Sequence, residues 1–153
     1  MANTYTQIYI QIVVVVKDRQ CLIPYEKKTN LYKYITGIVQ NKQHKLISIN
    51  GVSNHIHILI GYNPIEALST LVKEVKRCST NYINEQKWVR GKFSWQEGYA
   101  AFSYSRSQLD KVVIYIGNQE KHHNKKTFKE EYLEMLDKFE VEYNTKFIFE
   151  DAT

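Results

Sequence analysis

The chain has little of several features that would place it in other classes of protein. Only two of its 153 residues are cysteine, and Cys21 and Cys78 are too few and too isolated for a disulfide framework or a zinc site. No apolar run approaches the roughly 20 residues of a membrane helix, since residues 7–16 are too few and include Gln11. The N-terminus lacks the basic, apolar and small-residue segments of a signal peptide. We therefore expect a cytoplasmic protein with reduced thiols.

The composition is typical of a globular domain with an uneven charge distribution. Hydrophobic residues make up 43% of the chain and aromatic residues 13%, which favours a packed core over disorder. We see no repeat, low-complexity segment or linker, so a single domain is expected over residues 1–153. Residues 1–127 hold 18 Lys and Arg against eight Asp and Glu, whereas residues 128–153 hold three against eight. A basic body with an acidic tail favours nucleic-acid binding, although a soluble basic protein with a solvated acidic helix has the same charges.

Hydrophobic periodicity predicts the element order β-α-β-β-α-β(β)-α-α, which indicates an α+β fold with an antiparallel sheet covered by helices. Strands are predicted at residues 5–16, 46–49, 54–60 and, in one or two short pieces, 88–104. Helices are predicted from Pro24 onward, over about 63–86, from residue 107 onward and over about 128–142.

Turn and capping residues support these boundaries. Asn50-Gly51 is a turn signal that predicts a hairpin leading into residues 54–60. Residues 63–66, with the sequence Asn-Pro-Ile-Glu, predict a helix start with a cap and a first-turn proline. Capping boxes are expected at 107–110 and at 127–130, the second opening an acidic amphipathic helix.

Two histidines stand at alternate positions of the apolar strand 54–60. Side chains alternate across a strand, so His55 and His57 leave by one face while Ile56 and Ile58 leave by the other. A lone His-x-His is more often satisfied or exposed than ligating. Here, however, histidines on an otherwise apolar strand must be hydrogen-bonded or ligated, and neutral imidazole is a common metal ligand.

The helix after residue 107 carries a second group of polar side chains. Tyr115 and Gln119 are four residues apart and share one side of a helix. Leu109, Val112, Val113 and Ile116 form an apolar stripe, and Tyr115 lies off it, on the side of Lys111, Asn118, Gln119 and His122. Core packing is the ordinary role of a tyrosine, but this position suits a nucleophile better. His122 and His123 are possible further ligands. Lys111 and His122 could activate the phenol as a nearby cation or base, and the alternative is that both are simply solvated.

Cations also gather in the segment 73–92. We single out five of them as candidates for contacts with a DNA backbone, and the alternative is a solvated face. They are Lys73, Lys76, Arg77, Arg90 and Lys92.

The motifs in combination resemble the single-tyrosine HUH transposases of the insertion sequence 200/605 family, with REP-associated tyrosine transposases as close relatives. The resemblance rests on His55-Ile56-His57, on Tyr115-Ile-Gly-Asn-Gln119 after 57 intervening residues, and on the blocks at 95–103 and 118–123. It covers nearly the whole chain. The family often has a proline and an acid before the first histidine, where this chain has Ser53-Asn54.

The resemblance implies an RRM-like or ferredoxin-like fold and a homodimer in a bacterial or archaeal cell. It implies that single-stranded DNA is cleaved next to a hairpin, with Tyr115 attacking the phosphodiester to leave a 5′-phosphotyrosine and a free 3′-OH. His55, His57 and Gln119 would hold a divalent metal, Mg²⁺ or Mn²⁺. In this family the tyrosine helix of one subunit typically completes the site of the other.

Three classes of function stay open on the sequence. The first is the DNA strand transferase that the resemblance implies. The second is a domesticated relative that cleaves or binds chromosomal hairpins without transposing. The third is a non-catalytic nucleic-acid-binding sheet domain, against which the intact set of His55, His57, Tyr115 and Gln119 counts.

Overall fold

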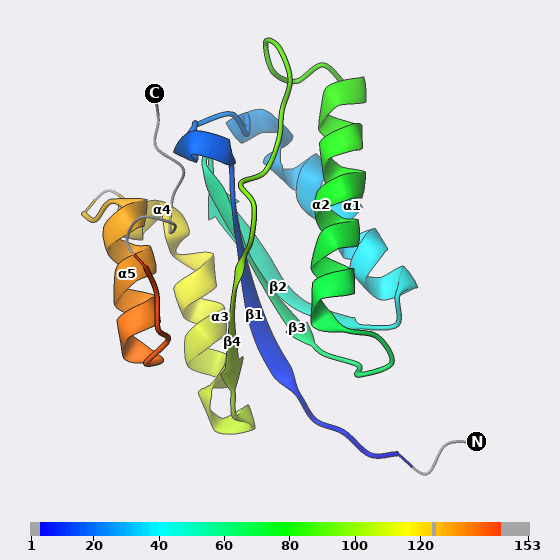
Figure 1. Cartoon of the computed structure of the whole chain (residues 1–153), viewed down its shortest axis with the longest axis vertical. Helices are drawn as coiled ribbons and strands as arrows, with labels where there is room; N and C mark the ends of the chain where they lie inside the picture. The colour runs from blue at the N-terminus through cyan, green and yellow to red at the C-terminus, as the bar shows by residue number, and fades with distance from the viewer. Residues whose placement is uncertain (1–3, 124, 145–153) are drawn as a thin grey trace.

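Four strands form one antiparallel sheet in the computed structural model, which describes residues 4–123 and 125–144 (Figure 1). The strand order is β2-β3-β1-β4. The bounds are β1 Tyr9–Val15, β2 Lys45–Val52, β3 His55–Gly61 and β4 Ala100–Tyr104. Since β3 and β1 are the inner pair, the histidine strand has a neighbour on each side, and the predicted α+β class is confirmed.

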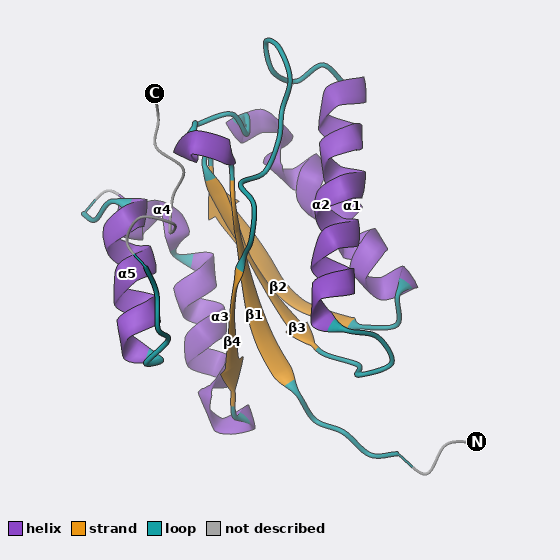
Figure 2. Ribbon diagram, in the orientation of Figure 1, coloured by secondary structure: helices purple, strands orange, loops and turns teal. Residues whose placement is uncertain are grey.

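Helices cover both faces of this sheet (Figure 2). They are α1 Lys28–Asn41, α2 Leu68–Glu85, α3 Leu109–Gly117, α4 Gln119–His123 and α5 Phe128–Lys138. Short 3₁₀ turns lie at Lys17–Arg19, Tyr25–Lys27 and Arg106–Gln108. Within the described residues, none of these helices combines the length and apolar character that crossing a membrane requires.

The alternation of side chains along β1 and β3 decides which helices meet which face. Ile12 and Ile58 belong to the core under α1 and α2, which form one layer in Figure 1. Val13 faces the other way and packs with residues of α5, while Leu59 packs with residues of α3. His57 pairs with Val13 in the β1–β3 ladder and so lies in the layer of α3, α4 and α5.

The predicted antiparallel hairpin before the histidines is confirmed, since β2 pairs with β3, but its turn lies elsewhere. Asn50 and Gly51 are part of β2, and the turn lies three residues later, at Ser53-Asn54. Gly51 is needed for close approach rather than for a turn, because a Cβ there would lie 2.2 Å from the His55 carbonyl oxygen.

Two predicted helix starts are also wrong by a few residues. Helix α2 begins at Leu68, since Asn63 Oδ1 accepts from the Ile65 amide in a local turn and Glu66 binds Lys42 and His44 instead of capping. The capping box before α3 joins Ser105 and Gln108 and opens a 3₁₀ turn, not residues 107–110.

Two other boundaries also shift by a few residues. Strand β1 begins at Tyr9 rather than at residue 5, and α5 ends at Lys138 rather than near 142. The Thr127 cap is confirmed, because its hydroxyl accepts from the Glu130 amide at 3.2 Å. The apolar stripe of α3 is narrower than predicted, since Val113 is 37% exposed.

Candidate active site

The two histidines of β3 lie side by side in the interior. Both His55 and His57 are fully buried, and their rings meet edge to face with centroids 5.1 Å apart. Strand pairing with β1 and β2 fixes the backbone, and the cover of α3, α4 and α5 excludes water. Buried imidazoles need polar partners, so the contacts of each nitrogen define what the site can bind.

His55 is held between two amide side chains. Its Nδ1 lies 2.7 Å from Asn54 Oδ1, and its Nε2 lies 3.0 Å from Gln119 Oε1. Asn54 thus stands where the family that the sequence resembles often has an acid. Burial, and to a smaller extent the neighbouring His57, lower the pKa of His55 to about 3. A neutral ring is the form that ligates metals.

His57 has an equivalent support from the sheet. Its Nδ1 lies 2.6 Å from Oε1 of Gln11, a buried residue of β1, and Gln11 Nε2 donates to the Tyr104 hydroxyl at 2.6 Å. On the other side, His57 Nε2 lies 3.1 Å from Glu131 Oε1. In the sequence, Gln11 stands out only as an interruption of an apolar strand. The signal that could have identified its role is that a polar residue lies on the face of the histidines.

Glu131 of α5 is a second residue of the site that the sequence did not predict. Its side chain is 5% exposed, its Oε2 lies 2.5 Å from His123 Nε2, and its Oε1 accepts a hydrogen bond from the Tyr115 hydroxyl. Burial alone would raise the pKa of Glu131, but its contacts with His123 and with the Tyr115 hydroxyl hold this pKa well below its usual range. Its place next to Tyr132 and Phe128 on the inward face of an amphipathic helix was the signal.

The donor atoms of this cluster suit a divalent cation. His55, His57 and Glu131 each offer one ligand atom, and these atoms lie within 4.8 Å of one another. Amide oxygens only accept, so Asn54 and Gln11 place the ring protons on Nδ1 and leave each Nε2 lone pair facing an oxygen. His57 Nε2 makes no hydrogen bond to any described residue. A cation bound between these nitrogen lone pairs and the oxygen atoms that they face would stabilise the arrangement.

Tyr115 joins this cluster from α3. Its ring stands edge to face against His57 with centroids 5.8 Å apart, and it lies 4.8 Å from the His122 ring. Burial raises the pKa of the Tyr115 phenol well above its usual range, and the bond to Glu131 raises it further. Asn50 Nδ2 donates to the Ile116 carbonyl at 3.0 Å and so ties the end of α3 to β2.

The structure therefore brings together all four residues predicted for the site. Tyr115 and Gln119, however, do not share one continuous helix as predicted. Helix α3 ends at Gly117, Asn118 is not helical, and Gln119 begins α4. Of the two possible extra ligands, His123 contacts Glu131 and His122 packs on the tyrosine ring.

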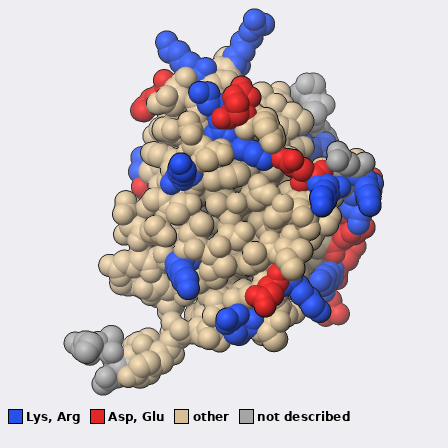
Figure 3. All heavy atoms as spheres, turned by 180° about the vertical axis from the view of Figure 1, so that it is seen from behind, with Lys and Arg blue, Asp and Glu red and all other residues tan. Residues whose placement is uncertain are grey.

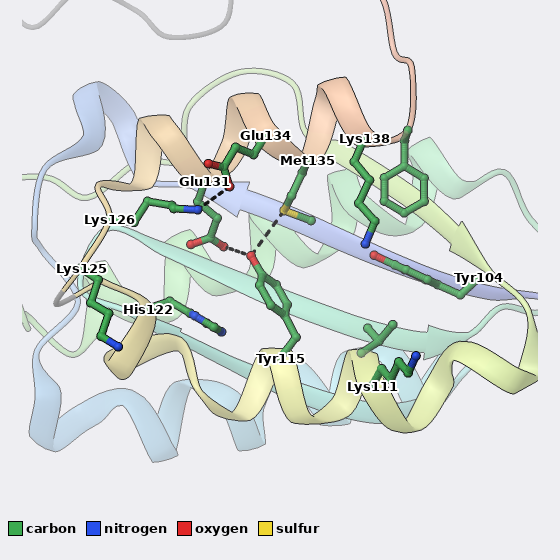
Figure 4. A pocket seen from close by; sticks show the side chains of 12 residues that line it. Tyr104, Lys111, Tyr115, His122, Lys125, Lys126, Glu131, Glu134, Met135 and Lys138 are labelled. Atoms are coloured by element: carbon green, nitrogen blue, oxygen red, sulfur yellow. Dashed lines mark hydrogen bonds and ion pairs between the residues drawn. The ribbon is translucent and has the colours of Figure 1, made fainter.

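A pocket of about 470 Å³ opens beside Tyr115 (Figure 4). It lies among α3, α4, α5 and the end of β4, and both Tyr115 and Glu131 line it. Four lysines also line it: Lys111, Lys125, Lys126 and Lys138. Lys126 pairs with Glu134 at 2.5 Å. Three of these cations lie outside every set that the sequence predicted.

The cations predicted for DNA contacts lie elsewhere. Lys73, Lys76 and Arg77 belong to α2, which packs on the face of the sheet opposite the histidines. Lys76 Nζ donates to the Gln96 carbonyl at 2.8 Å, and Arg77 pairs with Glu74. Both side chains are therefore already bonded to other groups of the same chain.

Comparisons with known proteins agree with this architecture. The family model described as "Transposase IS200 like" matches residues 4–119, and the chain belongs to this family of transposases. No curated protein matches the chain. A crystal structure of a candidate transposase from Deinococcus radiodurans R1 is 18% identical, with a TM-score of 0.59 over 78% of this chain and 95% of that one.

A second solved structure is a REP-associated tyrosine transposase bound to a REP hairpin. It is 13% identical and has a TM-score of 0.61 over 80% of this chain and 73% of that one. At these identities the two structures establish the fold, and the RRM-like sheet expected from the resemblance is confirmed.

Proposed function

We propose that this chain cleaves and rejoins single-stranded DNA next to hairpins through a 5′-phosphotyrosine on Tyr115. Membership of the IS200-like family supports a transposase-type function. The observation that carries the residue assignment is the meeting of Tyr115 with His57 and Glu131 in one buried cluster. A tyrosine beside two imidazoles and oxygen donors has the parts that nucleophilic phosphoryl transfer needs.

The chemistry starts from the Tyr115 hydroxyl. Its oxygen forms a bond to phosphorus while the bond to the 3′ oxygen breaks, which leaves a 3′-OH after protonation by water. His122 accepts the phenol proton in this proposal, because its ring packs on Tyr115 and its Nε2 makes no hydrogen bond to a described residue. Attack of a 3′-OH on the phosphotyrosine reverses these steps and reseals a strand without ATP.

The divalent cation is proposed to be held by His55, His57 and Gln119. Mg²⁺ or Mn²⁺ is expected, because oxygen atoms of Gln119 and of a DNA phosphate would complete its ligands. When bound, the cation supplies Lewis-acid polarisation of the phosphodiester. Asn54 and Gln11 orient the two rings through their Nδ1 atoms, as outer hydrogen-bond partners of metal ligands do.

A domesticated enzyme that acts on chromosomal hairpins is the second candidate. The similar fold of a REP-associated tyrosine transposase, whose solved structure is bound to a REP hairpin, favours it. Both candidates share the cleavage chemistry. They differ in genomic context, because hairpins repeated together with the gene indicate a mobile element.

The DNA and a second subunit are the proposed partners. Lys73, Arg90 and Lys92 are exposed and are proposed to contact DNA away from the scissile phosphate. A homodimer is supported by the family resemblance and by Ile114, which is 63% exposed on α3. Figure 3 shows that the rear of the molecule carries few charged side chains over its centre, as a surface covered by a partner would.

Denaturing electrophoresis tests the proposal. The protein is incubated with labelled single-stranded DNA that carries the hairpin flanking its gene, with Mg²⁺, Mn²⁺ or a chelator. We expect a metal-dependent covalent adduct. Absence of any adduct with both metals and several flanking strands would contradict the proposed activity.

A further inference from the structure

The proposed metal site is closed to a DNA strand in this conformation. His55, His57 and Gln119 are each 0% exposed. The Phe128 ring of α5 stacks on the His55 ring with centroids 3.9 Å apart. A phosphodiester must reach the Tyr115 oxygen and the histidine Nε2 atoms together, so something in this cover has to move before cleavage.

Glu131 identifies what has to move. Its carboxylate is the anion that accepts from the Tyr115 hydroxyl, and it lies beside His57 and His123. A phosphate that undergoes attack by Tyr115 needs the same neighbours, because the attacking oxygen and the metal ligands must both contact it. Two anions cannot share this volume.

We propose that the Glu131 carboxylate occupies the position of the scissile phosphate, and that DNA enters by displacing it together with α5. The inference rests on the proposed function. It adds where the scissile phosphate binds and which segment moves away to admit it. His123, released from Glu131, then becomes a contact for a phosphate oxygen.

Helix α5 can move without disrupting the sheet. It packs on Val13, Val15 and Phe102 through one apolar face, and no later helix or strand within residues 125–144 fastens it. The segment before it, residues 125–127, joins it to α4. Displacement therefore breaks one interface and leaves all four strands paired.

The lysine-lined pocket provides the route. Glu131 and Tyr115 lie at its wall, and Lys111, Lys125 and Lys138 surround it (Figure 4). These cations attract the phosphates of an incoming strand toward the carboxylate that the strand replaces.

Substitution of Glu131 gives the first test. Glu131→Ala and Glu131→Gln are compared with wild type and with Glu130→Gln, because Glu130 is the other acid in the first turn of α5 but is exposed. Single-turnover adduct formation is measured at saturating Mn²⁺ on one labelled strand. We expect at least an approximately tenfold faster rate in either Glu131 variant, since removing a competing anion raises the fraction of competent molecules. Glu130→Gln is expected to match wild type.

An unchanged or slower rate in folded Glu131 variants would overturn the inference, since Glu131 then stays in place as a ligand or base. Folding is checked by thermal melting, and the isosteric Gln variant decides if the Ala variant does not fold.

Hydrogen exchange on Tyr115→Phe protein gives a second test that leaves Glu131 intact and needs no cleavage. When single-stranded DNA and Mn²⁺ are added, the amides of Phe128–Lys138 should lose protection, and those of Leu68–Glu85 should not. Unchanged or increased protection of α5 in the DNA complex contradicts the inference. An active wild type with unaffected α5 refutes only the inference, whereas the absence of any adduct refutes the proposed function.

Discussion

The Tyr115 hydroxyl donates a hydrogen bond to the Glu131 carboxylate across 16 residues of chain. This bond joins the proposed nucleophile to a side chain from the last described helix. Burial and the neighbouring charge raise the pKa of the phenol, so the resting chain keeps its tyrosine protonated. Activation therefore requires the surroundings of Tyr115 to change when DNA and a cation bind.

The first prediction concerns the histidines as ligands. His55→Ala or His57→Ala should weaken Mn²⁺ binding by more than the roughly 10–100-fold that loss of a supporting hydrogen bond costs, and should abolish cleavage. Isothermal titration and the adduct assay measure the two effects. His44→Ala is the control, because both nitrogens of this buried ring are already used, by Glu66 and by the Asn63 amide. Cleavage at the wild-type rate by a variant of His55 or His57 would remove that residue from the site.

The support of His57 gives a second prediction. Gln11→Leu keeps the size of the side chain in β1 but removes the acceptor of the His57 Nδ1 proton. We expect metal affinity to fall by about 10–100-fold while the fold is retained. Gln40→Leu, on the exposed side of α1, is the matched control. Equal Mn²⁺ affinity in the Gln11 and Gln40 variants would show that the ring needs no such support.

How much of this site the sequence predicted depends on how local each contact is. His55 and His57 follow from strand periodicity, and Tyr115 from its position off the apolar stripe of α3. Glu131 and Gln11 did not follow, because their partners lie 74 and 46 residues away from them in the chain, at His57. Only the packing of α5 and β1 against β3 reveals those pairs.

The errors in the predicted boundaries of strands and helices have a similar origin. Asn50-Gly51 has the composition of a turn, but Gly51 serves the close approach of β2 to β3. Asn63 and Glu66 have the composition of a helix start, but tertiary contacts of Glu66 with Lys42 and His44 compete with capping. In both places local propensity was overridden by contacts between elements.

A third prediction tests the role of Gly51. Gly51→Ala should destabilise the protein by at least about 1–3 kcal/mol, since the added methyl meets backbone atoms of β3. Gly37→Ala, in the middle of α1 with nothing within 4 Å of the new Cβ, should instead stabilise it by about 0.5–1 kcal/mol. Urea denaturation of both variants measures the difference. A Gly51 variant as stable as wild type would contradict the close-approach interpretation.

The fourth prediction concerns the sharing of sites between subunits. The resemblance implied that the tyrosine helix of one subunit completes the site of the other. Within one chain, however, Tyr115 already lies against His57. A mixture of Tyr115→Phe and His57→Ala proteins under subunit exchange should therefore remain inactive. Recovery of the covalent adduct in the mixture would show that the tyrosine helix crosses between subunits in the state that cleaves.

The assignment of Tyr115 as the nucleophile is tested most directly by mass spectrometry of the protein after reaction with single-stranded DNA and Mn²⁺, followed by nuclease and protease digestion. We expect a nucleotide joined through its 5′ phosphate to the peptide that contains Tyr115. We also expect Tyr115→Phe protein to form no such adduct while it binds the same strand with nearly unchanged affinity. A nucleotide on another residue, or an adduct of equal yield with Tyr115→Phe, would contradict the assignment of Tyr115 as the nucleophile.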